Sequence, residues 1–537
     1  MKAQCLPFSQ IPHTTRLFSD FLSSSPKVQP FYPRSPFFNE WVNDEATRVS
    51  YDEVRRKRVA GMLERQNRAW GASAKTLANI ERFRSGALVT VTGQQVGLFG
   101  GPAYSIYKAL TAVKLAEQAT RAGIDAVPVF WLATEDHDLA EVNHVSILGA
   151  QSALHTISLS TQGKPNAPVG TVCFGVEMDE AVAKVAAVLG DTEVVGFVRE
   201  SYRSGETFGS AFARFFSRLL AEWGVVLLDP MDPEFHELSR PVFRASIECA
   251  GELDNGLLAR GKALELAGYH QQVKVTASST LLFAVRDGVR TPIHRKANDG
   301  GVFLVAEEKV SQSDLLREID QQPEHFSANV LLRPVMQDYL LPTLTYTGGA
   351  AEVAYFAQGA VVYKALLGRV TPVVPRFSAT LIESKPQVLL EKYKLALPDF
   401  FSGSEMLREK LAREVLPQAI QAAFDRADGS LETSLASLRE ALSRLDPTLM
   451  EAAGRSASKI QYQLHKLRSR TARAELRRSE VLSRHAEILS NALFPKRGLQ
   501  EREIGGVYFA SNHGQDLMGR LYDTIHTECL DHQVVTL

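Results

Sequence analysis

The chain has 537 residues, of which 45% are hydrophobic and 23% charged, and its formal net charge is -1 at pH 7. This composition is typical of a globular protein that is long enough for two or more domains. A net charge near zero argues against general nucleic-acid binding, which usually requires a strongly basic surface. No stretch has the apolar length needed to span a bilayer, and the N-terminus lacks a secretory signal pattern. We therefore expect a cytoplasmic protein with no membrane or nucleic-acid partner.

The four cysteines are far apart in the sequence and have no metal-ligand spacing: Cys5, Cys173, Cys249 and Cys529. In a reducing cytosol they are expected to be small, buried, free thiols. The sequence assigns none of them as a nucleophile, and it assigns no residue as a ligand of a resident metal.

The most informative stretch runs from Val89 to Asn143. A short β-branched run enters a glycine-rich loop that ends at Pro102, and helical spacing follows over residues 103–120. A second apolar run, residues 126–133, then predicts a strand. Such β-loop-α-β units build parallel sheets, so the stretch predicts an α/β core.

Two polar clusters directly follow these predicted strands: Gln94 with Gln95, and Glu135 to Asp138. Ligands of open parallel sheets bind beyond the carboxyl ends of the strands, and the free N–H groups at the start of the following helix suit an anion. The loop spacing matches neither the dinucleotide fingerprint nor the P-loop, so the loop alone is equally typical of a tight turn. Three acidic residues and a histidine within four positions favour a site over a solvated turn.

Six runs of the chain resemble the cysteine ligase family of bacillithiol biosynthesis. They cover nearly the whole chain: Thr92–Lys108, Pro128–His144, Leu332–Asp338, Tyr346–Gln358, Pro375–Thr380 and Leu499–Arg502. One departure is the pair Ala350-Ala351, where the family pattern has Pro-Gly. The resemblance implies a ligase that adds L-cysteine to glucosaminyl malate in the last step of bacillithiol biosynthesis.

Two segments are predicted as insertions into the core. The first, near residues 143–200, has strand-like runs at 154–159 and 170–174. The second, near residues 233–325, is helical at first and then predicts a hairpin that turns at Asp287-Gly288. Four basic residues lie in or near this hairpin: His270, Arg290, His294 and Arg295. Arginine can bind a substrate carboxylate through two hydrogen bonds. Lone basic residues near a hairpin are more often surface residues, so we expect these four on the surface.

The core sheet is predicted to continue with strands at 225–230, 329–335, 344–349 and 370–374. Gly348 and Gly349 precede a helix predicted at 350–367, where backbone N–H groups can face an anion. Glu352, near the start of that helix, is a candidate to bind an amine or hydroxyl group.

Helix formers dominate from residue 382 onward. Leucines at alternating steps of four and three form a heptad seam at positions 431, 435, 438, 442, 445 and 449. A long helix is then predicted from about 448 to 493, with one apolar column at Ile460, Leu467, Ala474, Val481 and Ile488 and a second column that becomes polar, at Leu464, Thr471, Arg478, His485 and Ala492. This pattern predicts a helical arm or antiparallel hairpin, packed on itself or on a second copy.

The sequence thus predicts an α/β protein with a Rossmann-like parallel-sheet core over residues 1–380, a helical coiled-coil arm over 381–498, and a segment, 499–537, that returns to the core. The resemblance implies a homodimer formed through the arm. It also implies a nucleotide, ATP or ADP, at the junction of core and arm, where the candidate contacts are Arg376, Ser378, Leu499, Gln500 and Arg502.

Amide formation needs an activated carboxyl group, usually an acyl phosphate or acyl adenylate made from ATP, and an amine in its neutral form. His137 is the candidate general base because histidine titrates near neutral pH. Asp136 or Asp138 could orient it or hold the substrate ammonium, and Glu135 with Asp138 could instead hold Mg²⁺.

The candidate substrate-binding residues come from both glycine turns and their neighbours: Gly93, Gln94, Gln95, Tyr104, Lys108, Asn143, Gln337, Gly348, Gly349 and Glu352. Lys108 is expected at the limit of reach, because it lies about one and a half turns into its helix at about 3.6 residues per turn.

Two other classes of function remain open. The first is an enzyme that resembles class I synthetases or nucleotidyltransferases and acts on another acid and amine, although the chain has no His-x-Gly-His motif. The second is a dimeric metabolite-binding protein without catalysis. Nucleotide hydrolysis that depends on an acid and an amine would separate these two classes.

Overall fold

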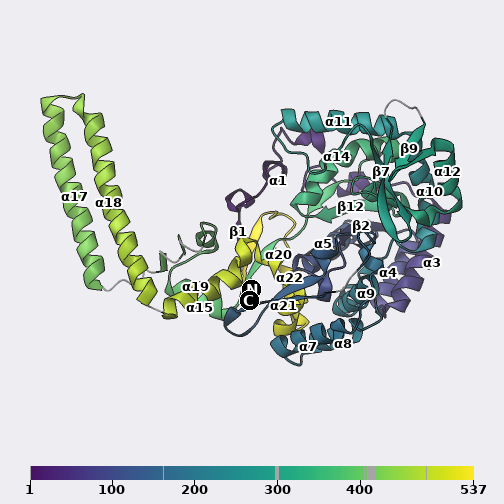
Figure 1. The fold of residues 1–537 in the computed structure, drawn as a ribbon, viewed down its shortest axis with the longest axis horizontal. Helices are drawn as coiled ribbons and strands as arrows, with labels where there is room; N and C mark the ends of the chain where they lie inside the picture. Colours follow the sequence, from purple (N-terminus) through teal and green to yellow (C-terminus); the bar gives the residue numbers. More distant parts are fainter. Residues whose placement is uncertain are drawn as a thin grey trace. The chain divides into compact units, whose positions relative to one another are not determined.

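The computed structural model describes residues 2–160, 163–296, 301–403, 406–407, 410–411, 418–478 and 480–537. The chain divides into two compact units (Figure 1). The first unit comprises Met1–Gly149, Leu154–Thr380 and Gln500–Val535, and the second comprises Ala150–Ala153, Leu381–Leu499 and Thr536–Leu537.

The first unit is built around a five-stranded sheet with the order β13-β12-β2-β3-β6. Every neighbouring pair in it is parallel. The strands are β2 (Leu88–Gln94), β3 (Ala126–Leu132), β6 (Val226–Leu228), β12 (Thr343–Gly348) and β13 (Val373–Pro375). The predicted α/β class with a Rossmann-like parallel sheet is confirmed. The chain first adds strands on one side, from β2 to β3 to β6, and then on the other, so the order reverses between β2 and β12.

Burial explains why these runs form the central strands. All seven residues of β3 are buried, as expected for a parallel strand that is covered on both faces. Helix α5 (Tyr104–Arg121) packs on β2 and β3, and helix α14 (Ala350–Leu367) packs on β12 and β13. Helices α3 (Glu53–Ala69) and α4 (Ala74–Arg84) pack against β6. An apolar cluster beside the sheet includes Phe38, Trp41, Leu115, Leu344 and Val374.

The segment from 233 to 325 contains helices and most of a second, antiparallel sheet of order β10-β9-β8-β7-β11. The helices are α10 (Pro233–Glu248), α11 (Ala250–Leu266) and α12 (Gln312–Gln321), and the strands are β7 (Ser279–Arg286), β8 (Val289–Arg295), β9 (Val302–Val305), β10 (Glu308–Ser311) and β11 (Phe326–Ala328). Asp287 and Gly288 connect β7 to β8 with φ angles of 51° and 74°, as the Asp-Gly signal predicts for a two-residue hairpin.

The segment from 143 to 200 contains a hairpin of β4 (His144–Leu148) and β5 (Leu154–Ser158), followed by α7 (Glu177–Leu189) and α8 (Glu193–Ser201). The strand predicted at 170–174 is wrong, because Val169–Thr171 is a short 3₁₀ turn. Helix α9 (Phe208–Leu219) follows and starts at a Thr207 cap.

The core strand predicted at 329–335 is also wrong. Residues from Arg333 to Leu340 form helix α13, which has Pro334 in its first turn. The side chain of Asn329 explains the difference, because its Oδ1 accepts hydrogen bonds from the N–H groups of Leu331 and Leu332. Such local side-chain bonds favour a turn over a strand, and proline is well suited to the start of a helix.

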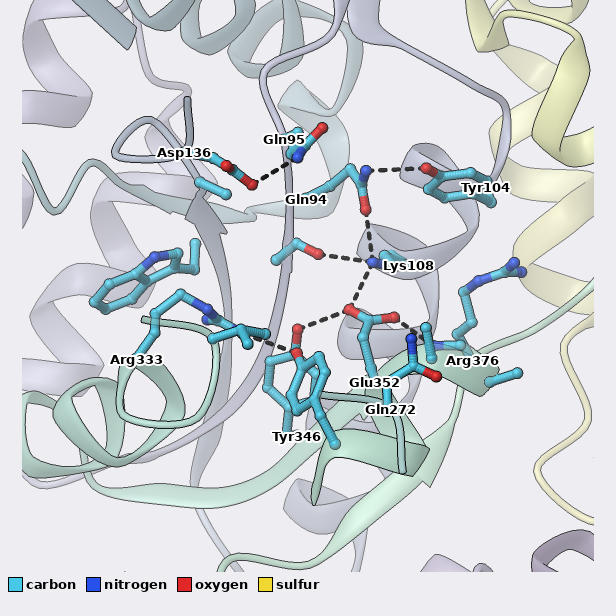
Figure 2. A pocket seen from close by; sticks show the side chains of 18 of the residues that line it. Gln94, Gln95, Tyr104, Lys108, Asp136, Gln272, Arg333, Tyr346, Glu352 and Arg376 are labelled. Atoms are coloured by element: carbon cyan, nitrogen blue, oxygen red, sulfur yellow. Dashed lines mark hydrogen bonds and ion pairs between the residues drawn. The ribbon is translucent and has the colours of Figure 1, made fainter. Parts of the chain in front are cut away.

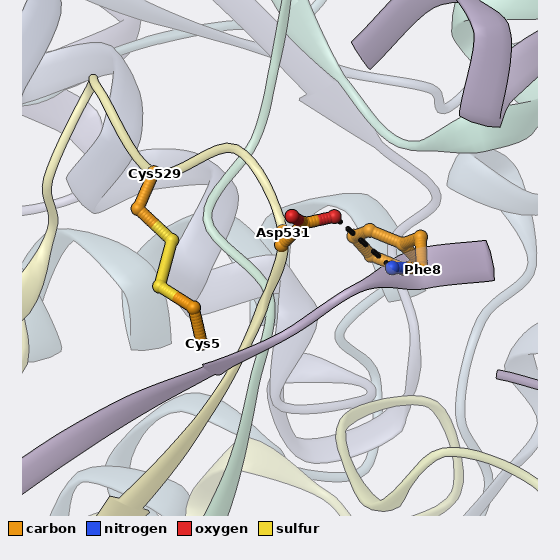
Figure 3. The surroundings of a disulfide bond; sticks show 4 residues. All are labelled: Cys5, Phe8, Cys529 and Asp531. Atoms are coloured by element: carbon orange, nitrogen blue, oxygen red, sulfur yellow. Dashed lines mark hydrogen bonds between the residues drawn. A yellow bond between two sulfur atoms is a disulfide. The ribbon is translucent and has the colours of Figure 1, made fainter. Parts of the chain in front are cut away.

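Two of the cysteines are not free thiols. Cys5, in β1 (Lys2–Leu6), forms a disulfide with Cys529, which precedes β15 (His532–Thr536) (Figure 3). Next to this bond, Asp531 Oδ1 accepts a hydrogen bond of 3.0 Å from the Phe8 N–H. Sequence spacing could not reveal the pair, because 524 positions separate residues that become neighbours only when β1 and β15 pair in one sheet. Of the two free cysteines, Cys173 is exposed rather than buried.

The second unit contains the predicted coiled coil. Helices α17 (Gln418–Leu445) and α18 (Leu449–Arg478) pack as an antiparallel hairpin, in which Arg468 pairs with Asp425 at 2.9 Å. Helices α15 (Ser384–Lys392) and α19 (Glu480–Leu493) pack together in the same unit. No helix in the described ranges is both long enough and apolar enough to cross a bilayer.

The two apolar columns of the arm have different surroundings. In α18, Ala457 is buried and Leu464 is half-buried, so this column faces the hairpin. Ile460 and Leu467, in the other column, are 46% and 54% exposed. On α18, the column with the better heptad pattern is therefore the one that the hairpin leaves uncovered, whereas Ile488, further along this column in α19, is buried.

Candidate active site

A cavity of about 580 Å³ opens in the first unit, beyond the carboxyl ends of β2 and β12. These are the two strands between which the strand order reverses, and doubly wound sheets bind ligands at that point. Ten of the residues predicted for the site line this cavity: Gly93, Gln94, Gln95, Tyr104, Lys108, Asp136, Gly349, Glu352, Arg376 and Arg502.

A buried ion pair joins the two sides of the cavity (Figure 2). Lys108 Nζ lies 2.7 Å from Glu352 Oε1, 2.7 Å from Gln94 Oε1 and 2.8 Å from the Gly93 carbonyl oxygen. The expectation that Lys108 lies at the limit of reach is wrong, because side chains in a helix point back toward its N-terminus. The long lysine side chain therefore reaches the end of β2.

Glu352 has a full set of hydrogen-bond donors. Besides Lys108, its Oε1 accepts from the Tyr346 hydroxyl at 2.9 Å, and its Oε2 accepts from the Gly349 N–H at 2.5 Å. The last contact is the backbone half of a capping box, since Glu352 is the third residue of α14. Burial alone would raise the pKa of Glu352, but the charge and hydrogen bond of Lys108, with the other donors, lower it. This carboxylate is therefore ionised and fixed.

Three cations surround the ring of Tyr104. Arg376, Lys108 and Arg502 lie 5.1, 5.5 and 5.6 Å from its centroid. Burial raises the pKa of Tyr104 to about 12, so its hydroxyl keeps its proton, and that hydroxyl accepts a hydrogen bond from Gln94 Nε2 at 2.9 Å. An aromatic ring attracts cations to its face without neutralising them. Lys108 is paired with Glu352 and Arg376 with Glu501, so the unpaired positive charge that remains for an anionic ligand is that of Arg502.

The two arginines differ in their other partners. Arg376 donates to Glu501 Oε1 at 2.7 Å and to the Phe377 carbonyl oxygen, but its buried Nε–H has no partner. Arg502 forms no ion pair with any residue that the structure describes. Unpaired guanidinium N–H groups suit the oxygens of a carboxylate or phosphate.

Acidic residues line another part of the cavity. Asp136 accepts hydrogen bonds from Gln95 Nε2 at 2.6 Å and from the His137 N–H at 2.7 Å. Glu141, in the short helix α6 (Leu139–Val142), lines the cavity beside it. Trp131 also lines this cavity, and its buried indole N–H has no partner. The cavity therefore offers carboxylates to an amine and free donors to an acid.

Three of the four residues in the Glu135–Asp138 cluster do not line the cavity. Glu135 Oε1 pairs with the buried His236 Nε2 at 3.1 Å, and Asp138 caps α6 by accepting from the Glu141 N–H. His137 Nδ1 lies 3.1 Å from a guanidinium N–H of Arg290. Because arginine only donates, Nδ1 is the acceptor and the ring hydrogen is on Nε2. The proposed role of His137 as a general base stays a prediction.

Arg290 corrects an expectation about the hairpin. It is only 7% exposed rather than on the surface. Its remaining donors contact Ser327 Oγ at 2.9 Å and the Ala328 carbonyl oxygen at 3.1 Å. This arginine therefore joins the hairpin of the second sheet to the polar end of β3.

The other predicted site residues also lie outside the lining of the cavity. Gln337 is fully buried in α13 and accepts from Arg333 rather than following a strand. Gly348 ends β12, where an added Cβ would lie 2.7 Å from the Glu352 Cβ. Asn143 is the C-cap of α6, Ser378 donates to Glu501 Oε1 at 2.9 Å, and Gln500 is buried at the start of α20 (Gln500–Glu503). Leu499 belongs to the second unit.

Sequence analysis missed several lining residues: Trp131, Glu141, Lys274, Arg333, Tyr346 and Tyr355. Most of them lie within the runs that carry the family resemblance, and that resemblance was the signal that could have identified them. Lys274 lies outside these runs, and its segment reaches the cavity through the two hydrogen bonds between the Val273 backbone and the Gln358 side chain of α14. In the described ranges no cluster of three or more His, Cys, Asp or Glu side chains is arranged to hold a metal ion.

Comparisons with known proteins match the whole chain. Residues 1–377 match the family described as "Bacillithiol biosynthesis BshC, N-terminal Rossmann-like domain", and residues 379–537 match "Bacillithiol biosynthesis BshC, C-terminal coiled-coil domain". Relatives named "Putative cysteine ligase BshC" include one from Koribacter versatilis, 49% identical over 100% of both chains. Others come from Solibacter usitatus, 38% identical over 100% of both, and Salinibacter ruber, 33% identical over 97% of this chain and 96% of the relative.

Proposed function

The chain belongs to the BshC family of bacillithiol biosynthesis, and on this premise we propose that it is a carbon–nitrogen ligase that joins L-cysteine to glucosaminyl malate. The product of that reaction is a low-molecular-weight thiol, formed in the last step of the pathway. The reaction belongs in the cytoplasm, where cysteine and ATP are available.

One observation carries this proposal: the cavity at the strand-order reversal has cationic and anionic groups that match the charged groups of glucosaminyl malate. Glucosaminyl malate has an amine on its sugar and two carboxylates on its malyl group. Asp136 and Glu141 suit the amine, whereas Arg376, Arg502 and Lys274 suit carboxylate or phosphate oxygens. Lys108 and Glu352 neutralise each other, so they fix the geometry between these groups.

The chemistry requires the cysteine carboxyl group to be activated, and ATP is the proposed activator. Transfer of a phosphoryl or adenylyl group to that carboxyl gives a mixed anhydride, and the amine of glucosaminyl malate then attacks its carbonyl carbon. The unpaired donors of Trp131 and Arg376, two residues that line the cavity, are proposed to bind oxygens that carry negative charge in this sequence of steps.

Mg²⁺ is expected only as the ion that accompanies ATP. The residues proposed to hold it do not fit a resident metal, because Glu135 is bound to His236 and Asp138 caps α6. Magnesium often binds through substrate phosphates and few protein carboxylates, so we assign no step to a protein-held metal.

We also propose that the protein is a homodimer formed through the arm. Ile460 and Leu467 are seven residues apart on α18 and are 46% and 54% exposed, and Val481 of α19 is 59% exposed. A heptad column that its own hairpin leaves uncovered is suited to a partner helix. A second copy supplies such a helix with matching chemistry.

The test is a mass-spectrometric assay of the purified protein with ATP, Mg²⁺, L-cysteine and glucosaminyl malate. Formation of the cysteinyl amide is expected, and the accompanying nucleotide identifies the route: AMP indicates an acyl adenylate and ADP an acyl phosphate. Reactions that lack one substrate in turn are the controls.

Two results would favour the alternative functions. Amide formation with another acid and amine, and none with this pair, would indicate a synthetase of different specificity. Tight binding of glucosaminyl malate without ATP consumption would indicate a metabolite-binding protein.

A further inference from the structure

We propose that Glu141 accepts the proton that the substrate amine must lose before it attacks the activated cysteine. This inference rests on the proposed ligase function and adds to it the residue that prepares the nucleophile. It also assigns the Glu141 side of the cavity to the amine of glucosaminyl malate.

Three carboxylates line the cavity: Asp136, Glu141 and Glu352. Glu352 is occupied by Lys108, Tyr346 and a backbone N–H. Asp136 is occupied by Gln95 and by the His137 N–H. Glu141 belongs to no salt bridge in the described ranges, so it is the lining carboxylate with the most capacity to take a proton.

Local structure holds Glu141 at the cavity. Helix α6 has only four residues, and it starts at Asp138, whose Oδ1 accepts from the Glu141 N–H at 3.1 Å. This cap fixes the backbone of Glu141 directly after β3 and its polar turn. The side chain is exposed, so the carboxylate can change its protonation state without breaking a buried contact.

The charges that face Glu141 favour proton uptake. Partial desolvation by the surrounding residues raises its pKa, and the neighbouring carboxylates Asp136 and Asp138 raise it further, whereas a hydrogen bond from Gln95 and the charge of Arg502 oppose this. Tyr104 faces the same carboxylate but keeps its proton. A general base works best when its pKa approaches the working pH. The raised pKa of Glu141 is closer to neutral pH than that of an ordinary carboxylate.

Two residues that line this cavity have buried donors without a partner, which is a second observation in favour of a ligand here. Trp131 Nε1 and Arg376 Nε belong to side chains of residues that are 1% and 8% exposed, and neither has a partner. An unsatisfied buried donor is costly, by roughly 1–3 kcal/mol, so both N–H groups call for acceptor oxygens. The malyl carboxylates and the activated carboxyl group supply such oxygens when the amine lies near Glu141.

The proposed step conserves atoms and charge. The ammonium group of the substrate gives one proton to a Glu141 oxygen, which leaves a lone pair on nitrogen. That lone pair forms the bond to the cysteinyl carbonyl carbon, and the C–O bond to the phosphate group derived from a nucleoside triphosphate breaks with its electron pair. The departing phosphate oxygen accepts the second proton from nitrogen.

The test compares Glu141→Gln with the wild type in the amide-forming assay, over a range of pH. The kcat of the variant is expected to fall about 100-fold or more, the lower end of the usual contribution of a general base. The wild-type rate should decline as pH falls through the raised pKa of Glu141, and this acid limb should be absent from the variant. Glu180→Gln, at an exposed position of α7, is the matched control and should behave as the wild type.

A nucleophile that needs no base gives a second measurement. Hydroxylamine is mostly neutral near pH 7, so its conversion to cysteinyl hydroxamate should proceed at similar rates in Glu141→Gln and in the wild type. Equal loss of rate with both nucleophiles would overturn the proposal, because it would indicate a role in activation or folding. A Glu141→Gln rate within threefold of the wild type, with the acid limb retained, would overturn it as well.

Binding measurements separate this inference from the proposed function. Calorimetry measures the affinity for glucosaminyl malate and for malate, which lacks the amine. This comparison can be made even if the wild type forms no amide. Glu141→Gln is expected to bind glucosaminyl malate at least tenfold more weakly and malate equally well. Equal affinity for both ligands in variant and wild type would refute the assignment of the amine to Glu141, whatever the reaction proves to be.

Discussion

Lys108 Nζ and Glu352 Oε1 are 2.7 Å apart, and they come from the helices that follow β2 and β12. These strands lie on either side of the point where the strand order reverses. The ion pair therefore connects the two halves of the doubly wound sheet where they form the cavity. It positions both polar turns that surround the proposed reaction.

Lys108→Met should strongly destabilise the first unit. The substitution leaves the Glu352 carboxylate buried without its cation, and breaking a buried pair typically costs about 3–5 kcal/mol. Urea denaturation followed by tryptophan fluorescence measures the loss. The double variant Lys108→Met/Glu352→Gln removes both charges and should regain much of the lost stability. If the double variant is as unstable as Lys108→Met, an unpaired charge is not the cause.

The sequence was sufficient to predict the parallel sheet because its strands are buried on both faces. The continuous apolar run of β3 and the glycine turn after β2 are local signals, and both elements formed where they were expected. The strand predicted at 329–335 was wrong for an equally local reason. The Asn329 side chain accepts hydrogen bonds from two following N–H groups and so favours a turn.

Non-local contacts account for what the sequence could not predict. The pair Cys5–Cys529 depends on the pairing of the two chain ends. The burial of Arg290 depends on a sheet that packs against the end of β3. Glu141 had a local signal, since it follows the acidic cluster by three positions, but its importance emerges only when the partners of Asp136 and Glu352 are known.

Arg502→Gln should weaken anion binding without reducing stability. Arg502 lines the cavity and forms no ion pair with a described residue, so its removal leaves no buried carboxylate unpaired. Charge-assisted hydrogen bonds contribute about 1.5–3 kcal/mol, so the Kd for malate should rise by about tenfold or more. Calorimetry at two salt concentrations should also show a weaker salt dependence in the variant.

Arg520→Gln is the control for Arg502, because Arg520 is exposed on α22 (Asp516–Thr524), away from the residues that line the cavity. It should bind malate as the wild type does. If Arg502→Gln and Arg520→Gln have the same affinity for malate, Arg502 does not contact the anion.

His532 should make the protein less stable in mild acid. Its ring is fully buried, with Nδ1 2.7 Å from Ser378 Oγ and Nε2 2.9 Å from Thr380 Oγ1. Burial lowers its pKa from 6.5 to about 4. Between these values the unfolded chain binds a proton that the folded chain does not, so stability falls as pH decreases, by about 3 kcal/mol in total.

Urea midpoints measured from pH 7 to pH 4 test this dependence. His532→Gln lacks the titrating ring, so its midpoint should change less over that range than the wild-type midpoint. His270→Gln removes an exposed histidine and should keep the wild-type pH dependence. An unchanged slope in His532→Gln would show that other groups cause the acid sensitivity.

Leu467→Glu should convert the proposed dimer into a monomer. Leu467 is 54% exposed on α18, in the column that its own hairpin does not cover, so a charge there should disrupt a helix interface but not the chain itself. Light scattering after gel filtration should give twice the chain mass for the wild type and the chain mass for the variant. Gln463→Glu, at another exposed position of α18, is the control for added charge. A wild type that elutes as a monomer would contradict the dimer.

Reduction of the Cys5–Cys529 bond should lower the melting temperature. The bond links segments that are 524 positions apart, and it constrains the unfolded chain. Native disulfides typically stabilise a protein by about 2–4 kcal/mol. Calorimetric scans with and without dithiothreitol measure the difference. Cys5→Ser should melt at the temperature of the reduced wild type and should be insensitive to the reductant.

Thiol counting identifies the state that is compared. The oxidised wild type should have two reactive thiols after denaturation, from Cys173 and Cys249, and the reduced wild type four. Cys173→Ser removes an exposed free thiol and should leave the melting temperature and its response to reductant unchanged. A bond that small thiols reduce under native conditions would make the stability of the protein depend on the thiol pool to which the proposed product belongs. Four reactive thiols in protein purified without reductant would show that the bond does not form.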